Sequence, residues 1–190
     1  GRYNTAKGDA TTIVGGDSNS AEGASATVVG GDGNIAASDA LNGVIVGGSS
    51  NFATSDLSTI VGGFANAVAF GYAALIAGGS SSVVIGDYTV VGGGYLNTAF
   101  GEAATVAGGS TNSAVADYAT IVGGIGNHLT GDWSLVAGGE SNQATAAHGI
   151  VLGGKLNENH GGGSVLGGGE ANTVSGAYAV VVGGTSNDAG

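Results

Sequence analysis

Residues 104–114 read Ala-Thr-Val-Ala-Gly-Gly-Ser-Thr-Asn-Ser-Ala, and variants of this stretch recur along the whole chain. A glycine pair closes each short apolar run, at Gly15, Gly30, Gly47, Gly62, Gly78, Gly92, Gly108, Gly123, Gly138, Gly153, Gly167 and Gly183. An asparagine follows at Asn4, Asn19, Asn34, Asn51, Asn66, Asn97, Asn112, Asn127, Asn142, Asn157, Asn172 and Asn187. Only Ser82 interrupts this series, and every step is 15 residues except one of 17 and one of 16.

Self-similarity at a fixed period is the sequence signature of a repeat architecture. Thirteen repeat positions fill the 190 residues, which predicts a single repeat array over 1–190 and leaves no room for another domain. Gly1 and Gly190 both fall inside a repeat, so we expect this array to be a fragment of a longer chain.

Each repeat alternates two short strand segments with two turns. The stronger segment is β-branched, as in residues 120–122, and the weaker one is the Asn-x-Ala stretch. Every 15-residue window holds two or more glycines, which excludes helices. At about 3.3 Å per residue, one repeat makes a circuit of about 50 Å, which suits a flattened coil of two strands. The sequence therefore predicts an all-β fold, a parallel β-roll or β-solenoid of about twelve 15-residue, two-strand coils.

Composition excludes several classes of protein. The chain has 42 glycines but no proline and no cysteine, which excludes collagen, disulfide scaffolds and cysteine-based zinc sites. Its net charge is −11, with only three Lys and Arg residues, so we expect it to bind no nucleic acid and no anionic membrane. The longest stretch without polar side chains, residues 67–79, is too short to span a bilayer, so we expect no direct membrane insertion by this segment.

Three apolar runs do not alternate with polar residues: Val44–Val46, Val83–Ile85 and Val180–Val182. Continuous apolar runs are typical of strands that are buried on both faces. The interior of a thin coil covers one face, and no other segment of this chain can cover the second. We therefore expect copies of the chain to associate side by side around a common axis.

The repeat pattern resembles the YadA-like head of trimeric autotransporter adhesins, which is built from Hep/Hag repeats. It reads Thr-Val-x-Gly-Gly, then two variable residues, then Asn-x-Ala-x-Gly. Good copies are residues 104–114 and 120–131, and the resemblance covers essentially the whole chain. It implies a left-handed β-roll and a homotrimer displayed extracellularly on a bacterial outer membrane. It also implies cell adhesion and virulence functions, through attachment to host or matrix proteins, glycans, cells or surfaces. No stalk, neck or anchor pattern is present in these residues.

Two columns of equivalent positions contain polar side chains. The asparagine series predicts a structural ladder, since Asn tolerates tight turns and its amide can bond to the copies on either side. Five residues after each asparagine lies an acidic column, comprising Asp9, Asp39, Asp56, Asp87, Glu102, Asp117 and Asp132. We expect a solvated corner here. The alternative is a carboxylate stripe for basic partners or divalent cations, formed by Asp87, Glu102, Asp117 and Asp132, with Ca²⁺ as the best candidate among the metals.

The next position forms an aromatic column of Tyr72, Tyr88, Tyr118, Trp133, His148 and Tyr178. Because neighbouring residues in a strand face opposite ways, we expect these rings to point inward and to pack in the core or at an interface. The alternative is an exposed platform of rings for glycans or proteins, with Trp133 as a candidate contact. Phe64 and Tyr95 follow glycine pairs at exposed corners, and with Ile125 they are a candidate apolar patch.

Catalysis finds no support, and we expect a protein that is not an enzyme and has no cofactor. The three histidines fall at different phases, without metal-ligand spacing, and no nucleophile motif occurs. The favoured function is therefore a surface adhesin head. The alternatives are a bacteriophage tail-fibre or other extracellular fibre segment, which would place the chain on a virion, and third an ice-binding solenoid.

Overall fold

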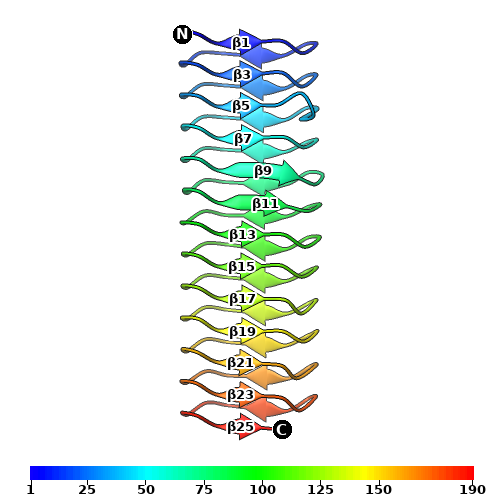
Figure 1. Ribbon diagram of the computed structural model, residues 1–190, viewed down its shortest axis with the longest axis vertical. Coiled ribbons are helices and arrows are strands. Elements are labelled where there is room, and N and C mark those ends of the chain that lie inside the picture. Colours follow the sequence, from blue (N-terminus) through cyan, green and yellow to red (C-terminus); the bar gives the residue numbers. More distant parts are fainter. The chain divides into compact units, whose positions relative to one another are not determined.

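A computed structural model describes residues 1–190, which form β-strands and turns and no helix. Two compact units divide the chain, residues 1–96 and residues 97–190. In each unit, short parallel strands stack one coil on the next (Figure 1), so each unit is a β-solenoid. The predicted all-β solenoid of about twelve coils is thereby confirmed.

In the first unit, each coil contributes one strand to each of two parallel sheets, which we call the odd and even sheets after their strand numbers. The odd sheet comprises β1 (Thr5–Ala6), β3 (Ser20–Ala21), β5 (Ile35–Ala36), β7 (Phe52–Ala53), β9 (Ala67–Phe70) and β11 (Val83–Ile85). The even sheet comprises β2 (Thr12–Ile13), β4 (Thr27–Val28), β6 (Val44–Ile45), β8 (Thr59–Ile60), β10 (Leu75–Ile76) and β12 (Val90–Val91).

The second unit repeats this arrangement (Figure 1). Its odd sheet comprises β13 (Thr98–Ala99), β15 (Ser113–Ala114), β17 (His128–Leu129), β19 (Gln143–Ala144), β21 (Glu158–Asn159), β23 (Thr173–Val174) and β25 (Asp188–Ala189). Its even sheet comprises β14 (Thr105–Val106), β16 (Thr120–Ile121), β18 (Leu135–Val136), β20 (Ile150–Val151), β22 (Val165–Leu166) and β24 (Val180–Val181).

Strand pairing follows the sequence repeat. Thr105 pairs with Thr120 and Val106 with Ile121, one repeat apart, and the same register continues to Leu135. Equivalent side chains of successive coils therefore form columns, and a feature of the repeat becomes a stripe along a unit.

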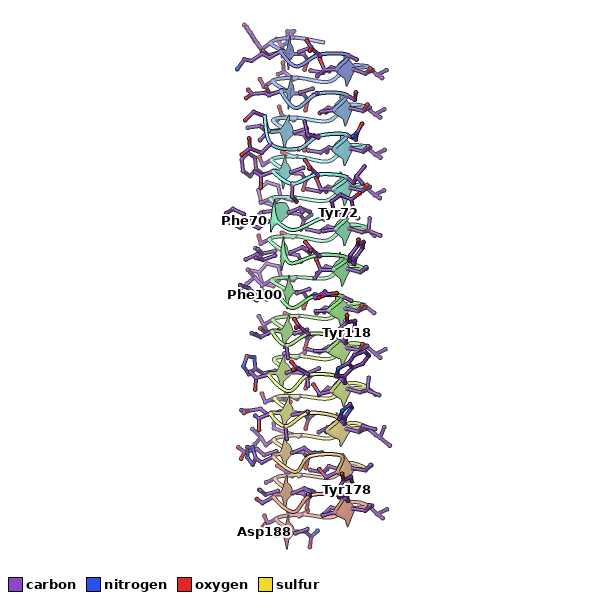
Figure 2. All side chains as sticks on the ribbon, turned by 90° about the vertical axis from the view of Figure 1, so that its right-hand side faces the viewer. Phe70, Tyr72, Phe100, Tyr118, Tyr178 and Asp188 are labelled. Carbon is purple, nitrogen blue, oxygen red and sulfur yellow. The ribbon has the colours of Figure 1, made fainter.

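The core lies between the two sheets of each unit. The second residue of each even-sheet strand is large and points inward, as with the fully buried Val106 and Ile121. The equivalent odd-sheet residue is mostly small, as with the fully buried Ala99 and Ala114. Side chains between the sheets and on their outer faces are visible in Figure 2. In most coils, one large and one small residue thus fill the thin interior at close packing.

The two glycines of a pair have different roles. Gly124 has a φ of +93°, and a Cβ there would lie 2.2 Å from the carbonyl oxygen of Gly139 in the next coil. A Cβ on Gly123 would meet no atom within 4 Å. Only the second glycine is therefore required, because its backbone is left-handed and touches the adjacent coil.

Two coils of the first unit depart from the 15-residue length. The 17-residue coil places its extra residues in the turn between β5 and β6. The 16-residue coil contains a β-bulge in β9: Val84 pairs with Val68 and Ile85 with Phe70, which leaves Ala69 without a partner. A bulge of this kind absorbs one extra residue and locally redirects the strand.

Candidate ligand-binding surfaces

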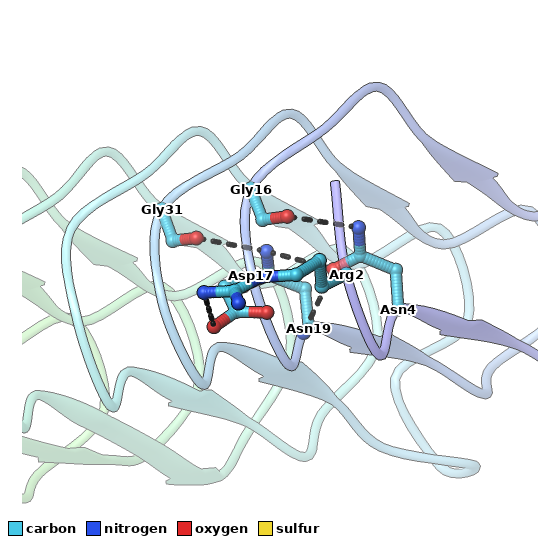
Figure 3. A network of polar contacts seen from close by, with 6 residues as sticks. All are labelled: Arg2, Asn4, Gly16, Asp17, Asn19 and Gly31. Carbon is cyan, nitrogen blue, oxygen red and sulfur yellow. Dashed lines mark hydrogen bonds and ion pairs between the residues drawn. The ribbon is translucent and has the colours of Figure 1, made fainter.

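The asparagines form a buried hydrogen-bonded ladder in each unit. In the first unit, Asn4 and Asn19 donate from Nδ2 to the carbonyl oxygens of Gly16 and Gly31, at 3.1 and 3.0 Å (Figure 3). The backbone N–H of Asn19 donates to Oδ1 of Asn4 at 3.0 Å. The same pattern recurs in the second unit, where Asn112 is fully buried. These side chains have their polar atoms satisfied inside the protein, so they support the turns and are not available to a ligand.

Members of the acidic column are exposed at the turns that follow the odd-sheet strands. In the second unit, Asp117 and Asp132 accept the backbone N–H of Glu102 and of Asp117, at 2.8 and 3.3 Å. In the first unit, Asp87 accepts the N–H of Tyr72 at 2.8 Å. Each of these aspartates therefore bonds one oxygen to the preceding coil and presents the rest of its carboxylate to solvent.

Asp39 does not belong to the acidic column, contrary to the sequence interpretation. The extra residues of its coil put Leu41 in that register instead, and the N–H of Leu41 donates to Oδ1 of Asp56 at 3.1 Å. No group of three or more His, Asp or Glu side chains is arranged to hold a metal ion.

The aromatic column points outward, so the expectation that it faces inward is wrong. Trp133 is 56% exposed and Tyr178 is 83% exposed. Tyr88, Tyr118, Trp133, His148 and Tyr178 all have left-handed backbones, with φ between +57° and +60°. These residues are at turns, where the alternation of side chains that holds within a strand does not apply.

Tyr72 lies outside the aromatic column, because the bulge at Ala69 shifts the register of its coil by one residue. Ala73 has a left-handed φ of +54°, and the equivalent residue of the next coil is Tyr88, with a φ of +57°. Tyr72 occupies the acidic register and bonds to Asp87, and its ring meets that of Tyr88 edge to face at 5.8 Å. Counting from the asparagine therefore misplaced this residue.

Three rings of the aromatic column stack in the second unit. The centroids of Tyr118 and Trp133 are 3.9 Å apart, with ring planes 7° from parallel, and those of Trp133 and His148 are 6.5 Å apart. Since the rings face one another, they turn their edges outward. This arrangement is a narrow aromatic ridge, an exposed row of rings of the kind that the sequence suggested as an alternative.

The ridge is joined to the acidic column at one end. The hydroxyl of Tyr118 donates to Oε1 of Glu102 at 3.0 Å. This hydrogen bond, together with the negative charges of Glu102 and Asp117, raises the pKa of the Tyr118 phenol above its ordinary value. Carboxylates and ring edges thus share one exposed stripe, formed by Glu102, Asp117, Tyr118, Asp132, Trp133 and His148, which we call the acidic–aromatic stripe.

Phe64 and Tyr95 are exposed, but the structure does not bring them together. Ser80 lies between them in the column of bridges that follows the glycine pairs of the first unit. Ile125 is exposed in the second unit. The first unit therefore holds two separate apolar side chains at these corners.

The outer face of the even sheet is a second exposed surface. The residue after each even-sheet strand points away from the core and is apolar or glycine in every coil. Most are exposed in both units, among them Val14, Val29, Val46, Val61, Val122, Leu152 and Val182. Two of the apolar runs that were expected to be buried on both faces, Val44–Val46 and Val180–Val182, belong to the even sheet and are covered on one face only within the chain. The third run, Val83–Ile85, is β11 of the odd sheet.

No known family model matches this chain, and no curated protein is significantly similar to it. No part of the chain forms an apolar helix of membrane-spanning length. The geometry of the exposed side chains is therefore the basis for assigning a function.

Proposed function

We propose that this chain is a non-enzymatic adhesin head that assembles as a homotrimer on the outside of a bacterial cell. Its even sheets would face the partner copies, and its turns would present variable side chains to a protein, glycan or solid surface. The YadA-like repeat pattern supports this function, since it recurs in phase along the chain.

The observation that carries the proposal is the apolar outer face of the even sheet. Val122 is 53% exposed and Leu152 is 52% exposed, and the equivalent residues of the neighbouring coils are the small Ala107, Ala137 and Gly167. Contiguous apolar surface of this kind is rare on monomers and marks an interaction site. A copy of the same face is a suitable partner because it is equally apolar and has the same spacing between coils.

The acidic–aromatic stripe supports a role in attachment. Stacked rings have little side-chain freedom left to lose on binding, so contacts to them cost little conformational entropy. Adjacent carboxylates favour partners that carry Lys or Arg, and they raise the rate of encounter with such partners.

The assembly is tested by measuring the mass of the purified chain with multi-angle light scattering. A mass three times the 17.7 kDa of the single chain is expected. A stable monomer over the accessible concentration range would contradict the proposed assembly.

Attachment is tested with beads coated with the purified chain, applied to cell layers, matrix proteins and plain polymer surfaces. The matched control is a bead coated with a variant in which Tyr118, Trp133 and His148 are replaced by Ser. Retention that depends on these side chains supports the adhesin. A trimer whose beads are retained nowhere would favour the extracellular fibre instead.

A further inference from the structure

The first unit contains an open cleft to which both irregular coils contribute, with one regular coil between them. Its walls are formed by the long turn after β5, the strand β7 and the bulge of β9, through Asp39, Phe52, Thr54, Ser55, Ala69, Phe70 and Gly71. The cleft encloses about 470 Å³, which is in the range of small-molecule sites. Both insertions of the unit therefore contribute to the same concave feature, and insertions in repeat arrays often lie on a binding face.

Two phenyl rings dominate the cleft. Phe52 is 40% exposed and Phe70 is 72% exposed, and Figure 2 shows Phe70 on the outer side of the odd sheet. Phe70 and the bulge residue Ala69 line the cleft side by side, which ties its shape to the extra residue of this coil. Exposed rings beside a concavity supply apolar contact to a ligand that has its own C–H surface.

One of the residues that line the cleft carries a buried hydroxyl. Ser55 is only 7% exposed, and its Oγ has no hydrogen-bond partner. The neighbouring Thr54 differs, because its hydroxyl bonds to the carbonyl oxygens of Val68 and Ala69. Ser55 also occupies a position that is glycine in four other coils of this unit, at Gly8, Gly23, Gly71 and Gly86. An unpaired buried hydroxyl costs about 1–3 kcal/mol, and a ligand that bonds to it removes that cost.

The charges of the cleft restrict the ligand. Asp39 supplies a carboxylate, whose Oδ1 accepts a hydrogen bond from the adjacent Ser38, and no Lys or Arg lines the walls. An anion would meet only repulsion here. A cation could pair with Asp39, but a compact cation would offer no C–H surface to the two phenyl rings. A neutral group with several hydroxyls suits both polar groups of the cleft. One of its hydroxyls can donate to the Asp39 carboxylate, and another can donate to or accept from the Ser55 hydroxyl.

The geometry points to a binding site for a neutral hexopyranose in this cleft. The C–H face of the sugar ring would lie against Phe70 and Phe52. One hydroxyl would donate to Asp39 and another would bond to Ser55. This site goes beyond the proposed function, because a cleft within one unit of one chain requires neither self-association nor attachment to a surface.

Saturation-transfer difference NMR on the intact chain, with D-glucose, D-galactose and D-mannose as separate probes, tests this site directly. At least one hexose is expected to receive saturation on its ring protons, with a dissociation constant on the order of 1–10 mM, because so small a ligand makes few contacts. N-acetylneuraminic acid, which is anionic, is expected to receive none.

Two variants and one control locate the binding. Phe70→Ala and Asp39→Asn are each expected to weaken hexose binding about tenfold. Phe100→Ala, which removes an exposed ring of the second unit (Figure 2), is expected to leave it unchanged. Both phenylalanines are exposed, so their loss leaves the core intact, and a thermal melt of each variant checks this.

Three results would overturn the inference. They are the absence of saturation transfer to all three hexoses, binding that is unaffected by Phe70→Ala, or tighter binding of spermidine or N-acetyl-tyrosinamide than of any hexose. The last result would assign the cleft to a cation or to a partner's aromatic side chain. Because the NMR signal does not depend on oligomeric mass, failure of this site and failure of the proposed trimer are separate outcomes.

Discussion

At the residue scale, a glycine pair combines one position that requires glycine with one position that has room for a side chain. Gly123 and Gly124 are adjacent in sequence, yet only Gly124 has a left-handed φ and contacts the next coil. Composition suggests that all 42 glycines have the same role, but of these two neighbours only Gly124 is constrained.

Gly124→Ala is expected to destabilise the protein by about 3 kcal/mol or more, because its Cβ would overlap the carbonyl oxygen of Gly139 and its φ would be strained. Gly123→Ala is the matched control and is expected to change stability by less than about 1 kcal/mol. Chemical denaturation of both variants measures the difference, and equal costs would contradict the separate roles.

Asn112→Ala is expected to cost about 3 kcal/mol. The change removes the amide that Gly108 O accepts from and the oxygen that accepts the N–H of Asn127, and both groups are left buried without these partners. The exposed neighbour provides a control: Thr111→Ala is expected to change stability by less than about 0.5 kcal/mol. Thermal melts measure both variants, and equal melting temperatures would contradict the stabilising role of the asparagine ladder.

The pKa of Tyr118 offers a test of the acidic–aromatic stripe. The hydrogen bond to Glu102 raises this pKa, so the folded protein holds the phenol proton more tightly than the unfolded chain. The resulting stabilisation is complete below the ordinary pKa of tyrosine, about 10, and is lost as pH rises through the folded value. Glu102→Gln is expected to lower the pKa of Tyr118, as followed by tyrosine-selective ¹³C NMR. An unchanged titration would show that the contact does not form in solution.

At the element scale, the strands are two residues long in most coils, so pairing between coils stabilises them more than any local preference does. Two-residue strands still have defined faces, and a one-residue slip would exchange core and solvent positions. The bulge in β9 shows how one extra residue is absorbed without such a slip, because Ala69 is left out of the register.

Deleting Ala69 is therefore expected to restore a 15-residue coil and to change stability by no more than about 1 kcal/mol. Deleting Ala99 is the contrasting case, since it moves Phe100 into the buried position of a regular strand. That deletion is expected to cost about 3 kcal/mol or more. Urea unfolding compares the two, and similar losses would show that the bulge is needed for folding.

At the scale of the whole molecule, each unit has a thin buried interior, enclosed between its two sheets, and a large exposed surface. The even sheet exposes an apolar outer face in both units, whereas the odd sheet mixes Phe, Val, Thr, His and Glu on its outer face. Such a difference between faces is expected where one face meets other copies and the other meets solvent.

Val122→Asp places a charge on the even-sheet face and is expected to lower the oligomeric mass or the melting temperature of the assembly by several degrees. Thr130→Asp adds the same charge to an exposed residue beside β17 of the odd sheet and is expected to have little effect. Light scattering and thermal melts report both effects. An equal response to the two substitutions would exclude the even sheet as the preferred interface.

The repeat period by itself determined the solenoid, the strand order and the place of every asparagine in the ladder. This was possible because pairing of identical coils converts a period in sequence directly into columns in space. The directions of the turn side chains could not be predicted that way. Strand alternation fails at left-handed residues such as Trp133, and the register of Tyr72 depends on which residue of its coil is left out as a bulge. Only the packing of one coil on the next decided these features, together with the cleft to which the two irregular coils contribute.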